Sequence, residues 1–273
     1  MIPAAFEYAR AGSVDEAISL LSEHGEDAKV LAGGHSLLPL MKLRLATPSA
    51  LIDVGRLQEL SYVRDAGDRI AIGALTRHRD LQVSDELARS APIVSHVAGL
   101  VGDPQVRHRG TIGGSVAHGD PASDLPAVVL ALDGELVIRG PAGERVVPAS
   151  EFFHGFLETA IGPDELLVEI RLRKTQGGWS YQKFNRRAQD WATVGVAVAR
   201  TDGTPAVALV NMGATPLRAA AVESALAAGA SPAEAAESAA EGADPSSDIQ
   251  ASAEFRRHLA RVLVRRGLEE AGV

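Results

Sequence analysis

The sequence contains no cysteine among its 273 residues. Disulfides, thiolate zinc sites and iron–sulfur clusters all depend on cysteine sulfur, so this polypeptide holds none of them. A redox centre carried by this chain would therefore be a bound organic cofactor or a metal with other ligands.

The sequence also lacks an excess of basic residues and any long apolar run. Lys and Arg number 27 against 35 Asp and Glu, a formal net charge of −8, whereas nucleic-acid binders are usually basic. No apolar stretch approaches the ~18 residues that a membrane span needs. No signal peptide is evident before Glu7. We therefore expect a cytoplasmic globular protein that binds no nucleic acid and does not span a membrane.

Patterns of metal ligands are missing as well. The eight histidines are scattered along the chain, with no HExxH or comparable spacing. No residue stands out as a general acid, a general base or a nucleophile. We expect no metal site and no catalytic side chain in this chain.

Turn and cap signals divide the chain into three expected segments, 1–54, 55–176 and 177–273, the last beginning at Gly177-Gly178. Each segment mixes helical and strand patterns, which predicts an α+β fold. In the first segment, the capping-box pattern from Ser13 to Glu16 starts a helix that ends at Gly25.

The patterns in the later segments predict further elements. In the second segment we expect strands at 70–73, 135–139 and 166–172 and helices at 77–83, 93–101 and 125–132. In the third we expect an antiparallel three-stranded sheet from 180–184, 194–199 and 206–211, followed by helices. Gly229 and the Ser231-Pro232 restart divide the Ala-rich 219–241 stretch into two helices, and Phe255, Leu259, Val262 and Leu263 form an apolar stripe on the last helix.

Two glycine pairs followed by a hydroxyl residue carry the main chemical signal. Gly33-Gly34-His35-Ser36 follows a short apolar strand, and Gly113-Gly114-Ser115 resembles it. Glycines allow positive φ and close approach of a ligand, and successive N–H groups can converge on an anion. Neither stretch matches the Rossmann or P-loop pattern. Two such loops can grip a diphosphate from two sides, which favours a dinucleotide but leaves FAD, NAD and coenzyme A open.

Read at full length, the two stretches resemble a specific family. The motifs are Ala32-Gly33-Gly34-His35-Ser36-Leu37-Leu38-Pro39 and the run from Asp103 to Ser115, which continues through Val116-Ala117-His118-Gly119-Asp120-Pro121-Ala122-Ser123-Asp124. They are similar to the medium subunit of carbon monoxide dehydrogenase and its relatives, which correspond to the flavin domain of xanthine dehydrogenase. The resemblance covers most of the chain.

The resemblance implies a fold and a set of FAD contacts. The implied fold is the FAD-binding type of p-cresol methylhydroxylase and vanillyl-alcohol oxidase, with two α/β subdomains and a C-terminal α+β domain. The implied contacts are the first loop and the strand before it (Lys29, Val30, Leu31, Ala32, Gly33, Gly34, His35, Ser36, Leu37), the second loop (Thr111, Ile112, Gly113, Gly114, Ser115), and Asp124, Leu167, Lys183 and Trp191.

Several of these positions have a second interpretation. Asp124 is placed near the ribityl and ribose hydroxyls, but it can also cap the helix that follows. Lys183 can lie on a solvated strand face and Trp191 can be plain core, while His35 is expected to shape its loop. The basic cluster from Arg107 to Arg109 faces either the diphosphate or a partner subunit.

In this family the flavin subunit relays electrons. The resemblance implies a large subunit with the molybdenum cofactor, a small subunit with two [2Fe–2S] clusters, and a heterohexamer built as a dimer of heterotrimers. Electrons pass through FAD to an external acceptor such as a quinone, NAD or oxygen. The absence of cysteine agrees with clusters in another subunit. The alternatives are a self-contained flavin oxidoreductase of the same fold and a non-enzymatic nucleotide-binding assembly module.

Overall fold

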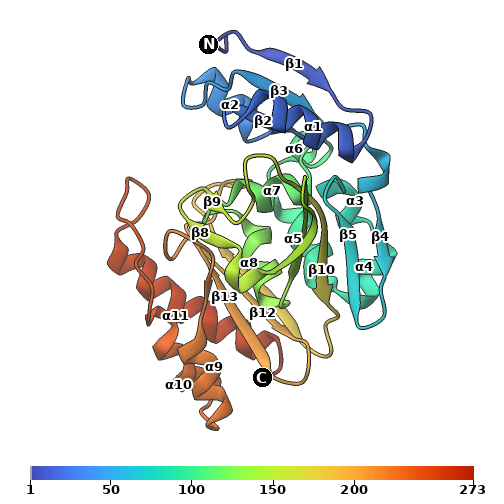
Figure 1. The fold of residues 1–273 in the computed structure, drawn as a ribbon. Helices are drawn as coiled ribbons and strands as arrows, with labels where there is room; N and C mark the ends of the chain where they lie inside the picture. The colour runs from blue at the N-terminus through green and yellow to red at the C-terminus, as the bar shows by residue number, and fades with distance from the viewer. Residues whose placement is uncertain (1) are drawn as a thin grey trace.

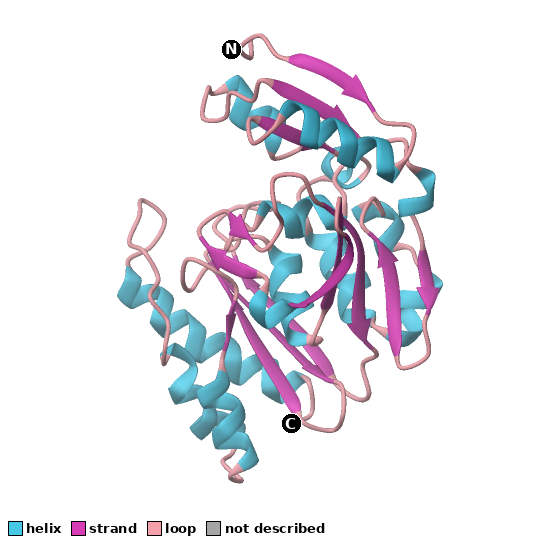
Figure 2. Cartoon of the chain, in the orientation of Figure 1, coloured by secondary structure: helices cyan, strands magenta, loops and turns pink. Residues whose placement is uncertain are grey.

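The structure is a computed structural model that describes residues 2–273. Residue 1, the first position of the expected 1–54 segment, lies outside them. The described chain forms three main sheets in chain order, with helices between and around them (Figures 1 and 2).

The first sheet is parallel and lies at the N-terminal end of the molecule (Figure 1). Its strands are β1 (Glu7–Arg10), β3 (Ala50–Asp53) and β2 (Ala28–Leu31), in that order across the sheet, with the helices α1 (Val14–His24) and α2 (Leu37–Lys42) between them in sequence.

Helix α1 begins and ends where its local sequence dictates. The Ser13 hydroxyl accepts from the Glu16 N–H at 3.1 Å. The Glu16 carboxylate accepts from the Gly12 N–H at 2.6 Å, one residue earlier than a capping box requires. Gly25 ends the helix with a φ of 71°.

The second sheet is antiparallel throughout. Its order is β4 (Val63–Asp65), β5 (Arg69–Gly73), β10 (Leu166–Arg173), β6 (Glu135–Gly140) and β7 (Gly143–Pro148). Between β5 and β6 the chain forms α3 (His78–Gln82), α4 (Asp85–Ser90), α5 (Pro92–Leu100), α6 (Pro104–Arg107), α7 (Ile112–His118) and α8 (Asp124–Ala131), and a small hairpin of β8 (Phe153–Gly155) and β9 (Glu158–Thr159) precedes β10.

The helices expected at 77–83, 93–101 and 125–132 are present as α3, α5 and α8. Helices α4, α6 and α7 were not expected. The second glycine pair lies inside the first turn of α7, and α6 precedes it rather than a strand. Only the first glycine pair therefore follows a strand.

The third sheet has four antiparallel strands, one more than the sequence predicted. They are β11 (Trp179–Phe184), β12 (Val194–Arg200), β13 (Pro205–Val210) and β14 (Leu217–Arg218). The strand β14 is two residues long, too short for its pattern to show in the sequence.

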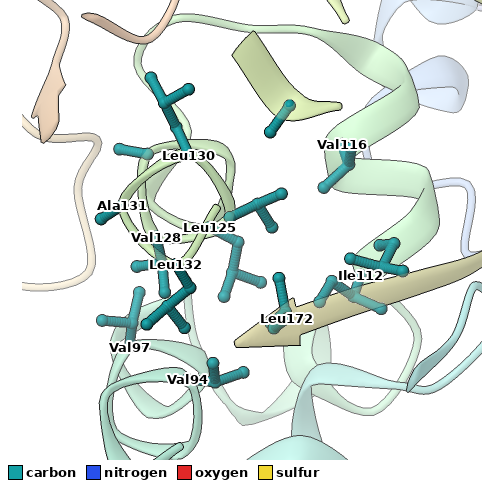
Figure 3. Packing of buried hydrophobic residues seen from close by; sticks show 14 of the residues in the cluster. Val94, Val97, Ile112, Val116, Leu125, Val128, Leu130, Ala131, Leu132 and Leu172 are labelled. Atoms are coloured by element: carbon teal, nitrogen blue, oxygen red, sulfur yellow. The ribbon is translucent and has the colours of Figure 1, made fainter. Parts of the chain in front are cut away.

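A helical layer fills the space between the second and third sheets. One core joins apolar side chains of α5, α7 and α8 to β10 on one side and to β12 and β13 on the other. Figure 3 shows part of it, with Val97, Ile112, Leu125 and Leu172 among the packed side chains. Because this layer touches both sheets, it fixes their separation.

The outer face of the third sheet is covered by the C-terminal helices. These are α9 (Ala220–Ala227), α10 (Pro232–Ala236) and α11 (Ala253–Glu270). The predicted capping box at Ser231 is present, with both Ser231 and Glu234 bonded.

The apolar stripe expected on α11 is only partly correct. Leu259 and Leu263 are buried, but Phe255 is 43% exposed. The buried face of α11 also includes Arg256, Ala260 and Val264, each one residue after a position of the expected stripe or its helical repeat. The fully buried Arg256 joins this face because its guanidinium bonds to the Thr193 carbonyl and to Asp248 at 2.7 Å, and a polar partner in the fold is invisible to a hydrophobicity pattern.

The N-terminal unit packs on the other face of the second sheet, with α1 in contact with β10. Its core includes Val137, Leu166 and Val168 from β6 and β10. Within residues 2–273, every helix is too short or too polar to cross a bilayer.

Candidate cofactor site

A cavity of about 610 Å³ is lined by residues of all three sheet units. This size is typical of cofactor pockets. It receives both glycine loops, the start of α8, the start of β10 and the loop after β11. The predicted residues that line it are Lys29, Val30, Leu31, Ala32, Gly33, Gly34, His35, Ser36, Leu37, Thr111, Gly113, Gly114, Ser115, Asp124, Leu167, Lys183 and Trp191.

Ile112 is the one predicted residue that does not line this cavity. Its side chain is fully buried among apolar side chains of the helical layer (Figure 3). Ile112 follows the N-cap residue of α7, and its side chain packs toward β10. It therefore supports the second loop on the side away from the cavity.

The first loop has the features of an anion-binding loop. Among residues 2–273, no acceptor is found for the backbone N–H groups of residues 33–36. Gly34 has a φ of 75°, in the left-handed region that favours glycine. The Ser36 hydroxyl makes no capping bond to α2. Four successive N–H groups and a hydroxyl are therefore free to bind an anion such as a diphosphate.

In the second loop, the N–H groups of residues 112–115 already have acceptors. Ile112 and Gly113 donate to the carbonyls of Thr76 and Ala74 at 3.0 and 2.8 Å. Gly114 donates to the Thr111 hydroxyl at 3.1 Å, which caps α7. The two loops therefore differ, because residues 33–36 have free N–H groups and residues 112–115 do not. The second loop supplies an exposed Gly114 surface and the Ser115 side chain.

Gly113 has a packing role. An ideal Cβ at this position would stand 2.5 Å from both the Cβ and the carbonyl oxygen of Ala74. The absence of a side chain therefore lets α7 begin directly against the end of β5.

Asp124 and Lys183 form a buried ion pair in the cavity wall. The Lys183 Nζ lies 2.8 Å from the Asp124 Oδ2, and both side chains are less than 10% exposed. The Tyr181 hydroxyl donates to the Asp124 Oδ1 at 2.6 Å. Burial raises the pKa of Asp124, and the two donors oppose that shift. Lys183 is therefore not on a solvated face.

The capping role considered for Asp124 is not observed. Helix α8 begins at Asp124 itself, its N-cap residue is Ser123, and it has no side-chain cap. The carboxylate turns away from its own helix and toward β11.

Leu167 and Trp191 supply apolar surface. Leu167 is 4% exposed, and Trp191 is 50% exposed. Trp191 is therefore a wall residue open to solvent and not part of the core.

Sequence reasoning missed several polar residues that line the cavity, among them His78 and Glu165. His78 is 3% exposed, its Nδ1 has no partner among the described residues, and burial lowers its pKa to about 4. Glu165 accepts two bonds from Arg145, at 2.8 and 2.6 Å, and one from the Gly162 N–H, which hold the pKa of its carboxyl below the usual value against some burial. No sequence pattern distinguished either residue.

The basic cluster at 107–109 does not line the cavity. Arg107 donates to the carbonyls of Val101 and Gly102 at 3.2 and 2.9 Å. His108 bonds to the Pro104 carbonyl. These two side chains brace the α5–α6 connection, and Arg109 is exposed.

Metal ligands do not gather in the described part of the chain. Among residues 2–273, no group of three or more His, Asp or Glu side chains is placed to hold a metal ion. The donor set of the cavity instead fits a dinucleotide, with free N–H groups at the first loop and apolar walls at Leu167 and Trp191.

Comparisons with known proteins agree with this geometry. Residues 4–174 match the family described as the FAD binding domain in molybdopterin dehydrogenase. Residues 179–271 match the CO dehydrogenase flavoprotein C-terminal domain.

The similarity to individual relatives extends over the full length. The carbon monoxide dehydrogenase medium chain of Hydrogenophaga pseudoflava is 44% identical over 99% of this chain and 98% of the relative. That of Afipia carboxidovorans is 40% identical with the same coverage. A solved carbon monoxide dehydrogenase from Hydrogenophaga pseudoflava, which lacks the Mo-pyranopterin moiety, superimposes with a TM-score of 0.96 at 43% identity, over 100% of this chain and 99% of that one.

These matches confirm the family, the fold and the cofactor expected from the sequence. The chain belongs to the family of FAD-binding medium subunits of molybdenum hydroxylases, and it is the flavoprotein component of an oxidoreductase.

Proposed function

We propose that this chain holds FAD in the cavity between its three units and relays electrons from a small [2Fe–2S] subunit to an external acceptor. The units are proposed as 1–54, 55–176 and 177–273. The free N–H groups of residues 33–36 carry the proposal, because they form a preformed set of successive anion donors in the cavity.

The proposed FAD contacts are the residues predicted from the sequence. The first loop binds the diphosphate through its backbone. The second loop forms the opposite wall with Thr111, Gly114 and Ser115, and Ile112 supports it from behind. FAD supplies the redox chemistry when bound, and this chain's residues position it, shield it and set the charge around it.

The partners follow from the division of labour in the family. The sequence has no cysteine for clusters, so we propose a small subunit with two [2Fe–2S] clusters and a large subunit with the molybdenum cofactor. The proposed assembly is a cytoplasmic heterohexamer, a dimer of heterotrimers. A quinone, NAD or oxygen is the proposed final acceptor.

The organic substrate is bound by the large subunit in this proposal. Similar subunits bear names that refer to nicotine in Paenarthrobacter nicotinovorans and to caffeine in a Pseudomonas strain. Similar flavin subunits thus carry the names of different substrates. This is expected if another subunit determines which substrate is bound.

Affinity purification of the tagged chain from its native host tests the proposal. We expect two further subunits to copurify, with one FAD per copy of this chain and with iron, sulfide and molybdenum in the partners. A flavoprotein that oxidises an organic substrate without partners would show a self-contained oxidoreductase. A complex without flavin would show an assembly module.

A further inference from the structure

We infer that Tyr181 is a positioning residue of the cofactor cavity: its phenol fixes the Asp124 carboxylate, and that carboxylate fixes the Lys183 ammonium in the cavity wall. The inference rests on the proposed FAD site. Tyr181 does not itself line the cavity, so it acts through the two residues that do.

Tyr181 and Lys183 reach Asp124 from one face of β11. They are two residues apart on the strand, so their side chains point to the same side of the sheet. The Tyr181 Oη lies 2.6 Å from the Asp124 Oδ1, and the Lys183 Nζ lies 2.8 Å from the Oδ2. Each carboxylate oxygen therefore has a donor of its own.

The Tyr181 hydroxyl excludes a competing orientation of the carboxylate. Asp124 opens α8, and the first turn of this helix has no side-chain cap. Free N–H groups and the helix dipole attract an acidic side chain at that position. The bond from Tyr181 holds the carboxylate toward β11 instead, where it meets Lys183.

Lys183 then presents a fixed cation to the cavity. Its side chain is 9% exposed. Its ammonium donates to Asp124 and, at 3.5 Å, to the Leu100 carbonyl, which leaves one of its three N–H donors for a ligand. Lys29 is the other Lys or Arg among the described residues that line the cavity, and it is exposed. A fixed cation favours negative charge on a bound flavin and so raises its midpoint potential.

The neighbouring strand leaves room for the Tyr181 hydroxyl. Gly195 of β12 pairs with Lys183. An ideal Cβ on Gly195 would stand 3.1 Å from the Tyr181 Oη and 3.0 Å from the Val210 Cβ. Gly195→Ala therefore displaces the Tyr181 hydroxyl without removing it. This variant tests whether the position of the hydroxyl, and not only its presence, matters for the bond to Asp124.

A double-mutant cycle tests the inference in the chain purified with its partner subunits. FAD is removed, its rebinding is titrated by quenching of flavin fluorescence, and the flavin midpoint potential is measured. The four proteins are the parent, Tyr181→Phe, Lys183→Met and the double variant. We expect Tyr181→Phe to weaken FAD rebinding about tenfold and to lower the potential. In the Lys183→Met background, the same change should alter rebinding by less than about twofold.

Other outcomes overturn the inference. Equal losses from Tyr181→Phe in both backgrounds would show that Tyr181 does not act through Lys183. A lower melting temperature with unchanged FAD affinity and potential would make Tyr181 a packing residue only. If Tyr181→Phe does not assemble, Gly195→Ala takes its place, and we expect it to weaken FAD rebinding in the same Lys183-dependent way. The inference would be refuted if Gly195→Ala changed neither the FAD affinity nor the flavin midpoint potential.

The parent complex separates this failure from failure of the proposed function. If the parent rebinds FAD and the cycle shows no coupling, only the role of Tyr181 is wrong. If the parent does not rebind FAD, the proposed site is wrong and the inference falls with it.

Discussion

Gly33 and Arg109 bring the two glycine loops into direct backbone contact. An ideal Cβ on Gly33 would stand 2.3 Å from the Arg109 carbonyl oxygen and 2.8 Å from the Gly110 Cα. The loops can lie this close only because residue 33 has no side chain. One contact thus sets the spacing of two loops that lie 76 residues apart in the sequence, the difference between positions 33 and 109.

Replacing Gly33 with alanine should separate the loops. We expect Gly33→Ala to lose most of the bound FAD and to lower the free energy of unfolding by about 1–3 kcal/mol, because the added methyl group meets backbone atoms that cannot turn away. Flavin content and thermal melting measure both effects. Gly213→Ala is the matched control, since its Cβ would meet only the Thr215 carbonyl oxygen, at 3.8 Å. Full flavin content in Gly33→Ala would contradict the contact.

Gly114 is sensitive for a different reason. A Cβ here would stand 2.9 Å from the Thr111 Oγ1, the atom that caps α7. Gly114→Val should displace the cap, costing about 1 kcal/mol of stability, and should also fill part of the cavity and abolish FAD retention. Thr111→Ala removes the capping hydroxyl without adding atoms to the cavity, although Thr111 also lines it. We expect Gly114→Val to lose more flavin than Thr111→Ala. Equal flavin loss in the two variants would contradict the explanation that the valine fills the cavity.

Removing Asp124 should destabilise the apoprotein as well as the FAD complex. Asp124→Ala leaves the Lys183 ammonium buried without its carboxylate, and breaking one partner of a buried pair costs about 3–5 kcal/mol. The double variant Asp124→Ala/Lys183→Met should recover much of this loss, because no charge is stranded. Denaturant unfolding of the apo forms measures both values. A double variant no more stable than the single one would argue against a stranded charge.

His78 should make stability depend on pH. Its pKa is about 4 in the folded chain, against 6.5 for an exposed histidine. Between these values the unfolded chain binds more protons, so the contribution is complete above pH 6.5 and is lost as the pH falls toward 4. The loss amounts to about 3 kcal/mol. His78→Gln should flatten the dependence of unfolding free energy on pH in this window.

A surface histidine provides the comparison for this measurement. His154 is exposed, and His154→Gln is the matched control for the effect of the substitution itself. Identical pH profiles for the parent and His78→Gln would mean that His78 does not titrate as its burial implies.

The sequence by itself determined the elements that depend on near neighbours. Ser13 and Ser231 start helices where their spacing predicts, because a cap bonds to N–H groups two or three residues away. The long glycine motifs determined the family and, with it, the cofactor. The lack of cysteine excluded clusters outright, since no fold can supply a missing ligand.

Tertiary structure alone decided how the site is made. The carbonyls of Thr76 and Ala74 accept from the N–H groups of Ile112 and Gly113 in the second loop, and Tyr181 bonds to Asp124 across 57 positions of sequence. Burial of His78 and the outward position of Phe255 also depend on packing between segments. Hydrogen-bond partners and burial depend on which segments, distant in sequence, pack against each other. A local pattern of residue types does not contain this information.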